Sequence, residues 1–539
     1  MRRATIYAPT LREPPRELDL PGQRALARAG LLRARPDGGL LLLPLGVTAL
    51  ERLERTVCAA LAPWSPQRIL TSAGGQGHGA WVRSLARDVR SYRELPLVHV
   101  ALHHDQPSRP VPRWGLLGAG GEYRLSVRIA AADHADAEAM SASVTATLVD
   151  VVQAAGLPTL ELVGIARGQG SDRHIIVPGP PGERAGRGCA AACHAPLLDA
   201  LAPDPAPPRP DRGCATGPSR QVVPTPGAHT VDEVARLLGA DPGAVLKTLI
   251  VLLDGLPAAV LIPGDRELSV EKLSGAAGAC SVVLAPEHTV REVTGAPVGF
   301  AGPTGLAVPI WADHAVALGS VWITGANAPE AHALGAVAGR DFQVARWADL
   351  TRRPDGLPCP RCGAPSVAVS GPEVLTIWAP SGATAAGERW AVDARGGGAT
   401  EVVTGAIELQ LAGLLGAIAE QHHADGNLRW PLGFGPVDVG VVTLAAEPGD
   451  PCSITALELT AALDRAGLAW LYDDRDVRPG PKLADSAALG LPLEIIVGRR
   501  GVERGVVEVR DRLVGAVIEI AIADVLAWIV DRIGERRDP

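Results

Sequence analysis

The stretch that decides the fold begins with Thr230-Val-Asp-Glu-Val-Ala-Arg-Leu-Leu-Gly239 and continues into Val245-Leu-Lys-Thr-Leu-Ile-Val-Leu-Leu253. The first segment is typical of a helix, because Thr230 and Glu233 can form a capping box and Gly239 suits the C-terminal end. The second segment is a leucine- and valine-rich run typical of a buried strand. Strands, helices and glycine turns alternate up to about residue 341, which indicates an α/β domain of roughly 120 residues.

One lysine, Lys247, interrupts the apolar run. An unpaired ammonium inside a sheet is costly, so we expect Lys247 to point into a polar cleft. The alternative is an edge lysine whose ammonium reaches solvent. Asp265, in the turn Gly264-Asp-Arg-Glu-Leu268, is a candidate for orienting water or an amino group, although turn aspartates often bond their own backbone.

Two later segments add further candidates for a site. In the loop Gly299-Phe-Ala-Gly-Pro303, glycine permits close backbone approach, so its amides are candidates for binding substrate or an oxyanion; an ordinary tight turn is the alternative. Gly325-Ala-Asn327 follows, and then His332, which either borders the pocket or is a structural histidine.

These features, in this order and spacing, resemble the editing insertion domain of bacterial prolyl-tRNA synthetase and a related family of free-standing aminoacyl-tRNA deacylases. In that family the domain hydrolyses alanine wrongly attached to proline tRNA, since a proline site cannot strongly reject a smaller amino acid. The resemblance implies that the hydrolytic site uses positioned water and substrate, with no metal and no cofactor. The residues it implies are Lys247, Asp265, Gly299, Gly302, Pro303 and His332.

The resemblance extends over nearly the whole chain, including Leu40–Gly46 and Arg90–Leu97. It implies an α/β multidomain fold with a class II synthetase-like antiparallel-sheet core, an inserted α/β editing domain and a C-terminal α/β domain similar to anticodon-binding domains. Two proline-dense or irregular zones flank the insertion as linkers. The expected parts are core 1–195, linker 196–218, insertion domain 219–350, return linker and remaining core 351–430, and anticodon-binding-like domain 431–539.

The resemblance fails where proline activation would occur. Class II synthetases use arginines to stabilise charge on the nucleotide, and the matching positions hold Pro107 and Gly413. The loop 74–79, which in the family carries a carboxylate for the proline nitrogen, has none. We therefore expect no ATP site. The alternative is a rearranged enzyme in which other arginines bind phosphate; the candidates are Arg109, Arg113 and Arg124.

The C-terminal part alternates strand and helix from about residue 437. We expect a helix over 453–466 capped by Ser453, and a final packing helix over 520–533. Arg475, Arg478 and Lys482 match the family's pattern and are the expected tRNA-binding residues; a solvated turn and a helix cap are the alternative.

Composition bounds the remaining possibilities. A net charge of −8 argues against a general polyanion binder, so nucleic-acid binding must use local patches. No run reaches the roughly 20 apolar residues of a membrane helix and no secretory segment opens the chain, so we expect a cytoplasmic protein without a membrane partner. Cys359-Pro-Arg-Cys362 is half of a zinc-ribbon spacing, and Cys189, Cys193 and His194 could complete it. Reduced thiols without metal are the expected state.

The sequence thus predicts a hydrolase that releases alanine from mischarged tRNA(Pro), does not activate proline and forms a homodimer. One alternative is a working proline–tRNA ligase with a rearranged site, which would require ATP and Mg²⁺. Another is a non-catalytic tRNA-binding or regulatory protein.

Overall fold

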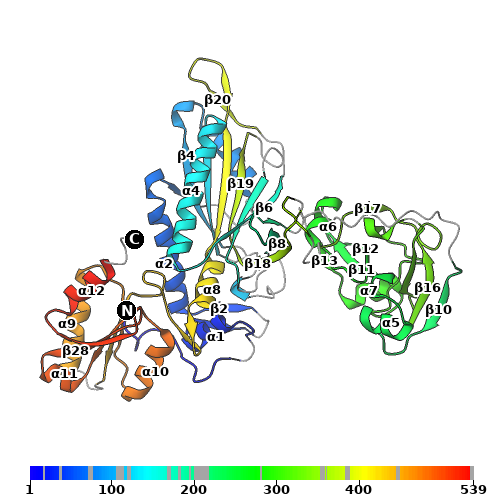
Figure 1. Ribbon diagram of the computed structural model, residues 1–539. Helices are drawn as coiled ribbons and strands as arrows, with labels where there is room; N and C mark the ends of the chain where they lie inside the picture. Colours follow the sequence, from blue (N-terminus) through cyan, green and yellow to red (C-terminus); the bar gives the residue numbers. More distant parts are fainter. Residues whose placement is uncertain are drawn as a thin grey trace. The chain divides into compact units, whose positions relative to one another are not determined.

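The computed structural model describes residues 1–15, 18–35, 39–70, 77–104, 115–117, 123–166, 171–179, 184–193, 196–198, 218–279, 282–317, 319–352, 358–359, 361–382, 389–444 and 449–534. Contacts divide the chain into two compact units. Unit 1 comprises Met1–Ala185 and Ser370–Pro539, and unit 2 comprises Gly186–Val369. Unit 2 is therefore inserted into the sequence of unit 1 (Figure 1, mainly green).

A largely antiparallel sheet forms the core of unit 1, in the order β6-β7-β19-β22-β5-β4-β3. Its strands are β3 (Gln67–Ile69), β4 (Leu97–His104), β5 (Tyr123–Ala131), β6 (Leu160–Ala166), β7 (Ser171–Ile176), β19 (Glu373–Ser381) and β22 (Val403–Gln410). Of these pairs, β3 with β4 is parallel. Small two-stranded sheets join β1 (Leu32–Ala34) to β2 (Leu40–Leu42), β20 (Ala391–Asp393) to β21 (Ala399–Glu401), and β23 (His423–Ala424) to β24 (Asn427–Leu428). The predicted antiparallel core is confirmed.

The helices of this core are α1 (Pro21–Arg28), α2 (Pro44–Ala60), α3 (Gly77–Asp88), α4 (His134–Ala154) and α8 (Leu411–Gln421). Helices α4 and α8 pack on the sheet, and α1 and α2 pack against α8. The longest, α4, runs along the sheet and contacts β5, β19 and β22 (Figure 1). Asp133 caps it by accepting a hydrogen bond from the Asp136 amide at 2.8 Å.

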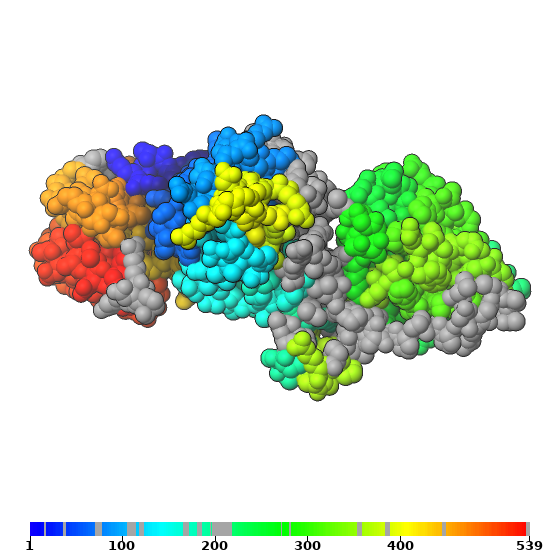
Figure 2. Space-filling model, turned by 90° about the horizontal axis from the view of Figure 1, so that it is seen from above, coloured from blue at the N-terminus to red at the C-terminus, as the bar shows by residue number. Residues whose placement is uncertain are grey.

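The C-terminal domain of unit 1 has a mixed sheet in the order β26-β25-β27-β28-β29. The elements are β25 (Val439–Thr443), α9 (Pro451–Arg465), β26 (Trp470–Asp473), α10 (Pro479–Leu489), β27 (Leu493–Val497), α11 (Arg499–Glu503), β28 (Val506–Asp511), β29 (Ala516–Ala521) and α12 (Val525–Gly534). The first residues of the chain lie against this domain, because the Arg3 amide donates to the Tyr472 carbonyl at 2.7 Å (dark blue beside orange in Figure 2).

Two details of the predicted C-terminal domain are wrong. Helix α9 is capped by Asp450, which accepts from the Ser453 amide at 2.8 Å, and Pro451 takes the first helical position. The last helix begins at Val525, because residues 516–521 pair with β28 as strand β29.

Unit 2 contains a mixed sheet in the order β10-β16-β15-β11-β12-β14-β17, with β13 also paired to β11. The strands are β10 (Gln221–Pro224), β11 (Val245–Leu253), β12 (Leu256–Pro263), β13 (Val282–Leu284), β14 (Ile310–Asp313), β15 (Val321–Gly325), β16 (Ala331–Val337) and β17 (Arg346–Ala348), and the helices are α5 (Val231–Leu238), α6 (Val270–Ala277) and α7 (Glu287–Thr294). The predicted capping box is confirmed: the Thr230 amide donates to Glu233 at 2.9 Å, and the Glu233 amide donates to the Thr230 hydroxyl at 3.3 Å.

The compact unit extends beyond 219–350 at both ends. Three short strands, β8 (Arg184–Cys189), β9 (Leu197–Leu198) and β18 (Ser366–Gly371), neighbour one another in the order β18-β8-β9. Within the described residues of the whole chain, none of the helices is long and apolar enough to cross a membrane.

Candidate active site

Lys247 is held by the turn that follows β12. Its ammonium donates to the Arg266 carbonyl at 2.7 Å and to Glu267 Oε1 at 2.9 Å. The Lys247 side chain is 20% exposed and that of Glu267 is 79% exposed, so the charge is paired at the surface of the sheet. Among the residues that the structure describes, these contacts use two of the three ammonium protons, and the third remains for another acceptor.

The same turn presents Asp265 to solvent. The Gly264 amide donates to the Val245 carbonyl at 2.7 Å, which ties the turn to the start of β11. A Cβ atom at Gly264 would lie 2.4 Å from the Pro242 carbonyl oxygen, so only glycine allows this approach. Lys247 and Gly264 thus fix the backbone on both sides of the Asp265 carboxylate.

The loop 299–303 packs directly on the end of β15. The Gly302 amide donates to Asn327 Oδ1 at 2.6 Å, and Asn327 Nδ2 donates to the Thr304 carbonyl at 2.8 Å. A Cβ atom at Gly302 would lie 1.8 Å from the Gly325 carbonyl oxygen. Pro303 beside it is buried and has no amide hydrogen. Because the Gly302 amide already donates its hydrogen bond to Asn327, it stabilises the shape of the loop and is not available to substrate.

His332, on β16, is only 3% exposed. Its Nδ1 atom lies 2.6 Å from the Thr225 hydroxyl, and its ring centroid is 5.6 Å from that of Phe300. Burial lowers the pKa of His332, opposed by its hydrogen bond to the backbone carbonyl of Gly299. A neutral ring that donates to Gly299 and accepts from Thr225 satisfies both contacts, so His332 positions the start of the loop.

Strand register brings these distant segments together. Leu246 on β11 pairs in parallel with Thr324 on β15, and Gly325 on β15 pairs with His332 on β16. Lys247 therefore lies at the same level of the sheet as the Gly325 segment, against which loop 299–303 packs. Sequence reasoning missed Thr225 and Phe300, which complete the surroundings of His332; a threonine and an aromatic residue carry no motif of their own.

In the synthetase-like core, Pro107, Arg109 and Arg113 lie outside the described residues, as do residues 74–76. Gly413 lies in α8, where it is buried; a Cβ atom there would lie 3.3 Å from Gln410 Cβ and 3.6 Å from the Glu373 carbonyl oxygen. Arg124 is paired with Glu408 at 2.5 Å.

A buried cluster near α3 was not predicted. Trp81 Nε1 donates to His99 Nδ1 at 3.0 Å, and the Arg128 guanidinium lies 6.0 Å from the Trp81 ring centre. His78 contacts the Thr404 hydroxyl at 2.8 Å, and burial together with the charge of Arg128 lowers its pKa to about 4. At neutral pH this cluster carries one cation and uncharged rings.

The three residues predicted to bind tRNA have different surroundings. Arg475 is clamped between Asp473, at 2.6 Å, and Asp485, at 2.8 Å, and these hydrogen bonds raise its pKa. Lys482 is 1% exposed and donates to the Thr443 carbonyl at 3.0 Å, so it holds the ends of strands inside the domain. Arg478, at the N-terminus of α10, is exposed. Contact of any of them with tRNA stays a prediction, and Arg478 has the accessibility for it.

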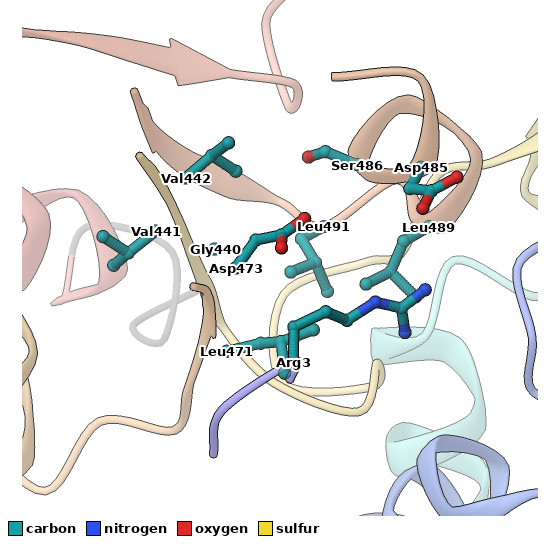
Figure 3. A pocket seen from close by; sticks show the side chains of 10 residues that line it. All are labelled: Arg3, Gly440, Val441, Val442, Leu471, Asp473, Asp485, Ser486, Leu489 and Leu491. Carbon is teal, nitrogen blue, oxygen red and sulfur yellow. The ribbon is translucent and has the colours of Figure 1, made fainter. Parts of the chain in front are cut away.

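A small pocket lies beside this ion-pair group (Figure 3). Arg3, Asp473 and Asp485 line its polar side, and the rest is mainly apolar side chains of β25 and α10. Burial, followed by the neighbouring charge of Arg475, lowers the pKa of Arg3. Its volume of about 20 Å³ is sufficient for a water molecule.

Comparisons with known proteins identify the class. Residues 225–342 match the family model of the aminoacyl-tRNA editing domain, and residues 438–532 match that of the anticodon binding domain. The fold is similar to that of prolyl-tRNA synthetase from Cryptosporidium parvum, solved with halofuginone and AMPPNP, with a TM-score of 0.51, 10% identity, and coverage of 96% of this chain and 77% of the other. These findings define an aminoacyl-tRNA synthetase-like protein with an editing domain.

Full-length relatives identify the family. The chain is 30% identical to a proline–tRNA ligase of Solidesulfovibrio magneticus, covering 96% of this chain and 95% of the relative. It is 29% identical to a proline–tRNA ligase of Geobacter sulfurreducens, covering 99% of each. The chain belongs to the prolyl-tRNA synthetase family.

Proposed function

We propose that unit 2 hydrolyses the ester linking a wrong amino acid, alanine in the first instance, to tRNA(Pro). The observation that carries this proposal is the arrangement around Lys247. Two of its ammonium protons fix the turn carrying Asp265, and the third has no acceptor among the described residues. The match of residues 225–342 to the editing-domain family supports it, since that range contains all six predicted site residues.

The chemistry needs a water, a cation or donor near the ester, and a shaped binding surface. Water adds to the ester carbonyl carbon, the bond to the tRNA 3′ oxygen breaks, and that oxygen takes up a proton. In this proposal Lys247 binds the ester or the neighbouring phosphate, and Asp265 orients water or the α-amino group. His332 is neutral with both ring nitrogens engaged, so it positions the loop 299–303 and does not exchange a proton.

The second candidate is a proline–tRNA ligase, and the comparisons support it better than an enzyme that only edits. Its support is the identity of 30% over nearly the full length of a protein named for that activity. ATP and Mg²⁺ would then be required. The buried Gly413 provides no cation for the nucleotide, so a ligase would have to use arginines from elsewhere in unit 1. Editing by unit 2 is compatible with either case.

The test is alanine release from purified Ala-tRNA(Pro), with proline-dependent ATP–pyrophosphate exchange measured on the same preparation. Lys247→Ala should lower release by at least about tenfold, as expected for removal of a charged hydrogen bond. Arg291→Ala is the control, because Arg291 is an exposed residue of α7 paired only with Glu287 of the same helix among its described contacts. Release unchanged by Lys247→Ala would refute the proposed role of Lys247. Pyrophosphate exchange would establish the ligase.

The partner and assembly belong to the same proposal. The anticodon-binding domain supports tRNA(Pro) as the nucleic-acid partner. We infer a homodimer, as the resemblance to the prolyl-tRNA synthetase family implies. Light scattering of the intact protein tests this inference, and a monomer mass at micromolar concentration would contradict it.

A further inference from the structure

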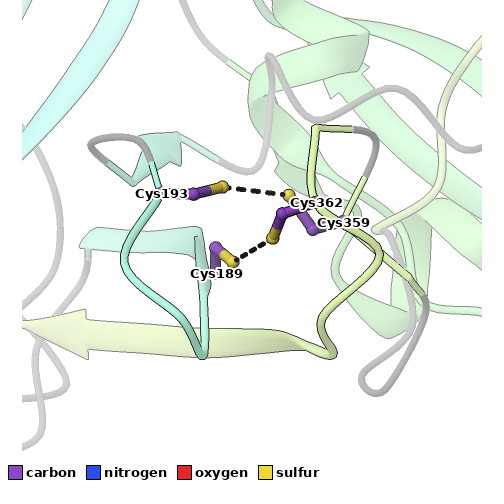
Figure 4. Close-up of side chains that lie close together, drawn as sticks. All are labelled: Cys189, Cys193, Cys359 and Cys362. Carbon is purple, nitrogen blue, oxygen red and sulfur yellow. Dashed lines mark hydrogen bonds between the residues drawn. The ribbon is translucent and has the colours of Figure 1, made fainter.

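Four cysteine thiols converge in unit 2, away from the predicted hydrolytic residues in the sequence. They are Cys189, Cys193, Cys359 and Cys362 (Figure 4). All four sulfur atoms lie within 4.8 Å of one another. The nearest pairs are Cys189 with Cys362 at 3.3 Å and Cys193 with Cys359 at 3.5 Å. The two members of each pair are separated by more than 160 residues, so the fold, and not local sequence, brings the thiols together.

The distances match a metal tetrahedron better than disulfides. A zinc ion bound by four thiolates at about 2.3 Å requires sulfur atoms roughly 3.8 Å apart, and the observed separations bracket that value. A disulfide needs about 2.05 Å and pairs thiols two by two. None of these four cysteines is in a disulfide. Two separate bridges would give no reason for all four sulfur atoms to gather around one point.

Cys189 and Cys193 lie on one turn, and Cys359 and Cys362 lie on another. Each of these two turns has the shape of a metal-binding turn. In the first turn, the Ala192 amide donates to the Cys189 carbonyl at 2.8 Å, and Ala192 has a positive φ of 48°. In the second, the Gly363 amide donates to the Cys359 carbonyl at 2.9 Å, and Gly363 has a φ of 74°. The Ala190 amide bonds the Pro365 carbonyl at 3.0 Å and thereby joins the two turns.

Backbone amides also point at the sulfur atoms. The Arg361 amide donates to Cys359 Sγ at 3.4 Å. Amides of Cys193 and Ala191 bond the Cys189 sulfur, and the Ala364 amide bonds that of Cys362. In three of these four hydrogen bonds the donor lies two residues after the cysteine. Amide donors stabilise thiolates more than thiols, because a charged acceptor makes the stronger hydrogen bond.

We propose that Cys189, Cys193, Cys359 and Cys362 bind one structural zinc ion. Each thiol releases its proton to solvent, so the ion and four thiolates together carry a charge of about −2. Four protein ligands close the tetrahedron and leave no position for water or substrate, which separates this ion from the hydrolytic chemistry. Soft thiolate ligands in this geometry select zinc or iron, and the absence of any required redox step favours zinc.

The position of the ligands suggests what the ion does. Cys189 and Cys193 lie close to the start of unit 2 and Cys359 and Cys362 close to its end. One ion would therefore connect the first and last turns of the unit. Such a link closes a long loop and reduces the conformational entropy of the unfolded chain. We infer that the zinc ion stabilises unit 2 by joining its first and last turns.

The test is zinc content measured by inductively coupled plasma mass spectrometry on the full chain, purified with reductant and dialysed against metal-free buffer. One zinc per chain is expected. Cys193→Ser combined with Cys362→Ser should remove it, and both positions are exposed, so packing changes little. Cys58→Ser is the matched control, because Cys58 is half-buried in unit 1 and should leave the zinc content unchanged.

A second measurement does not depend on a variant that folds. Wild-type protein stripped of metal and given Co²⁺ should show the intense visible bands of tetrahedral cobalt thiolate, which added zinc abolishes. Three results would overturn the proposal: wild type without zinc, equal zinc in the wild type and the double variant, or two disulfides among these cysteines in alkylated, unreduced protein. An iron-thiolate absorption spectrum of the purified protein would overturn the choice of zinc.

Discussion

Gly302→Ala tests the structure of the candidate active site most sharply. The added Cβ atom would lie 1.8 Å from the Gly325 carbonyl oxygen and 2.7 Å from the Gly325 carbonyl carbon. Ordinary contacts begin near 3.4 Å, so loop 299–303 must move away from β15 by more than about 1 Å. The move breaks the 2.6 Å hydrogen bond between the Gly302 amide and Asn327. Overpacking of about 1–3 kcal/mol and the lost hydrogen bond of about 1 kcal/mol should destabilise this region by roughly 2–4 kcal/mol.

Activity should fall more than stability alone would require, because displacing a binding loop by about 1 Å can cost about 100-fold in rate. The assays are alanine release from Ala-tRNA(Pro) and hydrogen exchange of peptides covering residues 297–304 and 321–327. Gly275→Ala is the control: the glycine lies in α6 with open space around it, so alanine should stabilise the helix by about 0.5–1 kcal/mol. If Gly302→Ala exchanges and edits like the wild type, the packing of the loop on β15 is not what shapes the site.

Three further predictions concern unit 1. The pKa of His78 is lowered to about 4 by burial. Below pH 6.5 the unfolded chain therefore binds a proton at this histidine that the folded chain does not bind. The free energy of unfolding should fall as the pH drops from 6.5 to about 4, by up to about 3 kcal/mol. Urea unfolding at pH 7 and 4.5 should show a smaller loss for His78→Gln, and equal losses would contradict the buried neutral ring. Arg478→Ala should weaken tRNA(Pro) binding and reduce its salt dependence by about one phosphate contact without changing stability. Lys482→Ala should instead destabilise the domain by about 1–3 kcal/mol, and weaker tRNA binding at unchanged stability would show that Lys482 contacts tRNA.

Features set by neighbours in sequence were predictable. The Thr230–Glu233 capping box needs only the local order of residues, and the structure contains it. The error at Ser453 is also local: Asp450 stands three residues earlier and precedes a proline suited to the first helical turn, so the better cap was missed. The error at Ile520 is not local. Residues 516–521 form a strand because they pair with β28. In so short a segment, the spacing of apolar residues does not distinguish the period of a helix from that of a strand.

The sequence offers the candidate site residues but not the contacts between them. The sequence predicts that Lys247 points into a polar cleft. Its partner in the structure is Glu267, 20 residues away, which is brought close because β12 pairs with β11. The contact of His332 with Thr225 spans 107 residues and depends on the pairing of β10 with β16. The same holds for the cysteines. The sequence shows that Cys189 is close to Cys193 and that Cys359 is close to Cys362, but only the fold shows that the four thiols lie together.

The most direct test of the central claim compares two substrates on one enzyme. Hydrolysis of Ala-tRNA(Pro) and of Pro-tRNA(Pro) is measured under single-turnover conditions with the intact chain, and with Lys247→Ala beside it. An editing enzyme of this family should release alanine well above the spontaneous rate, spare proline by about tenfold or more, and lose the difference in the variant. Alanine release at the spontaneous rate from the intact chain would contradict the account and leave unit 2 as a binding domain.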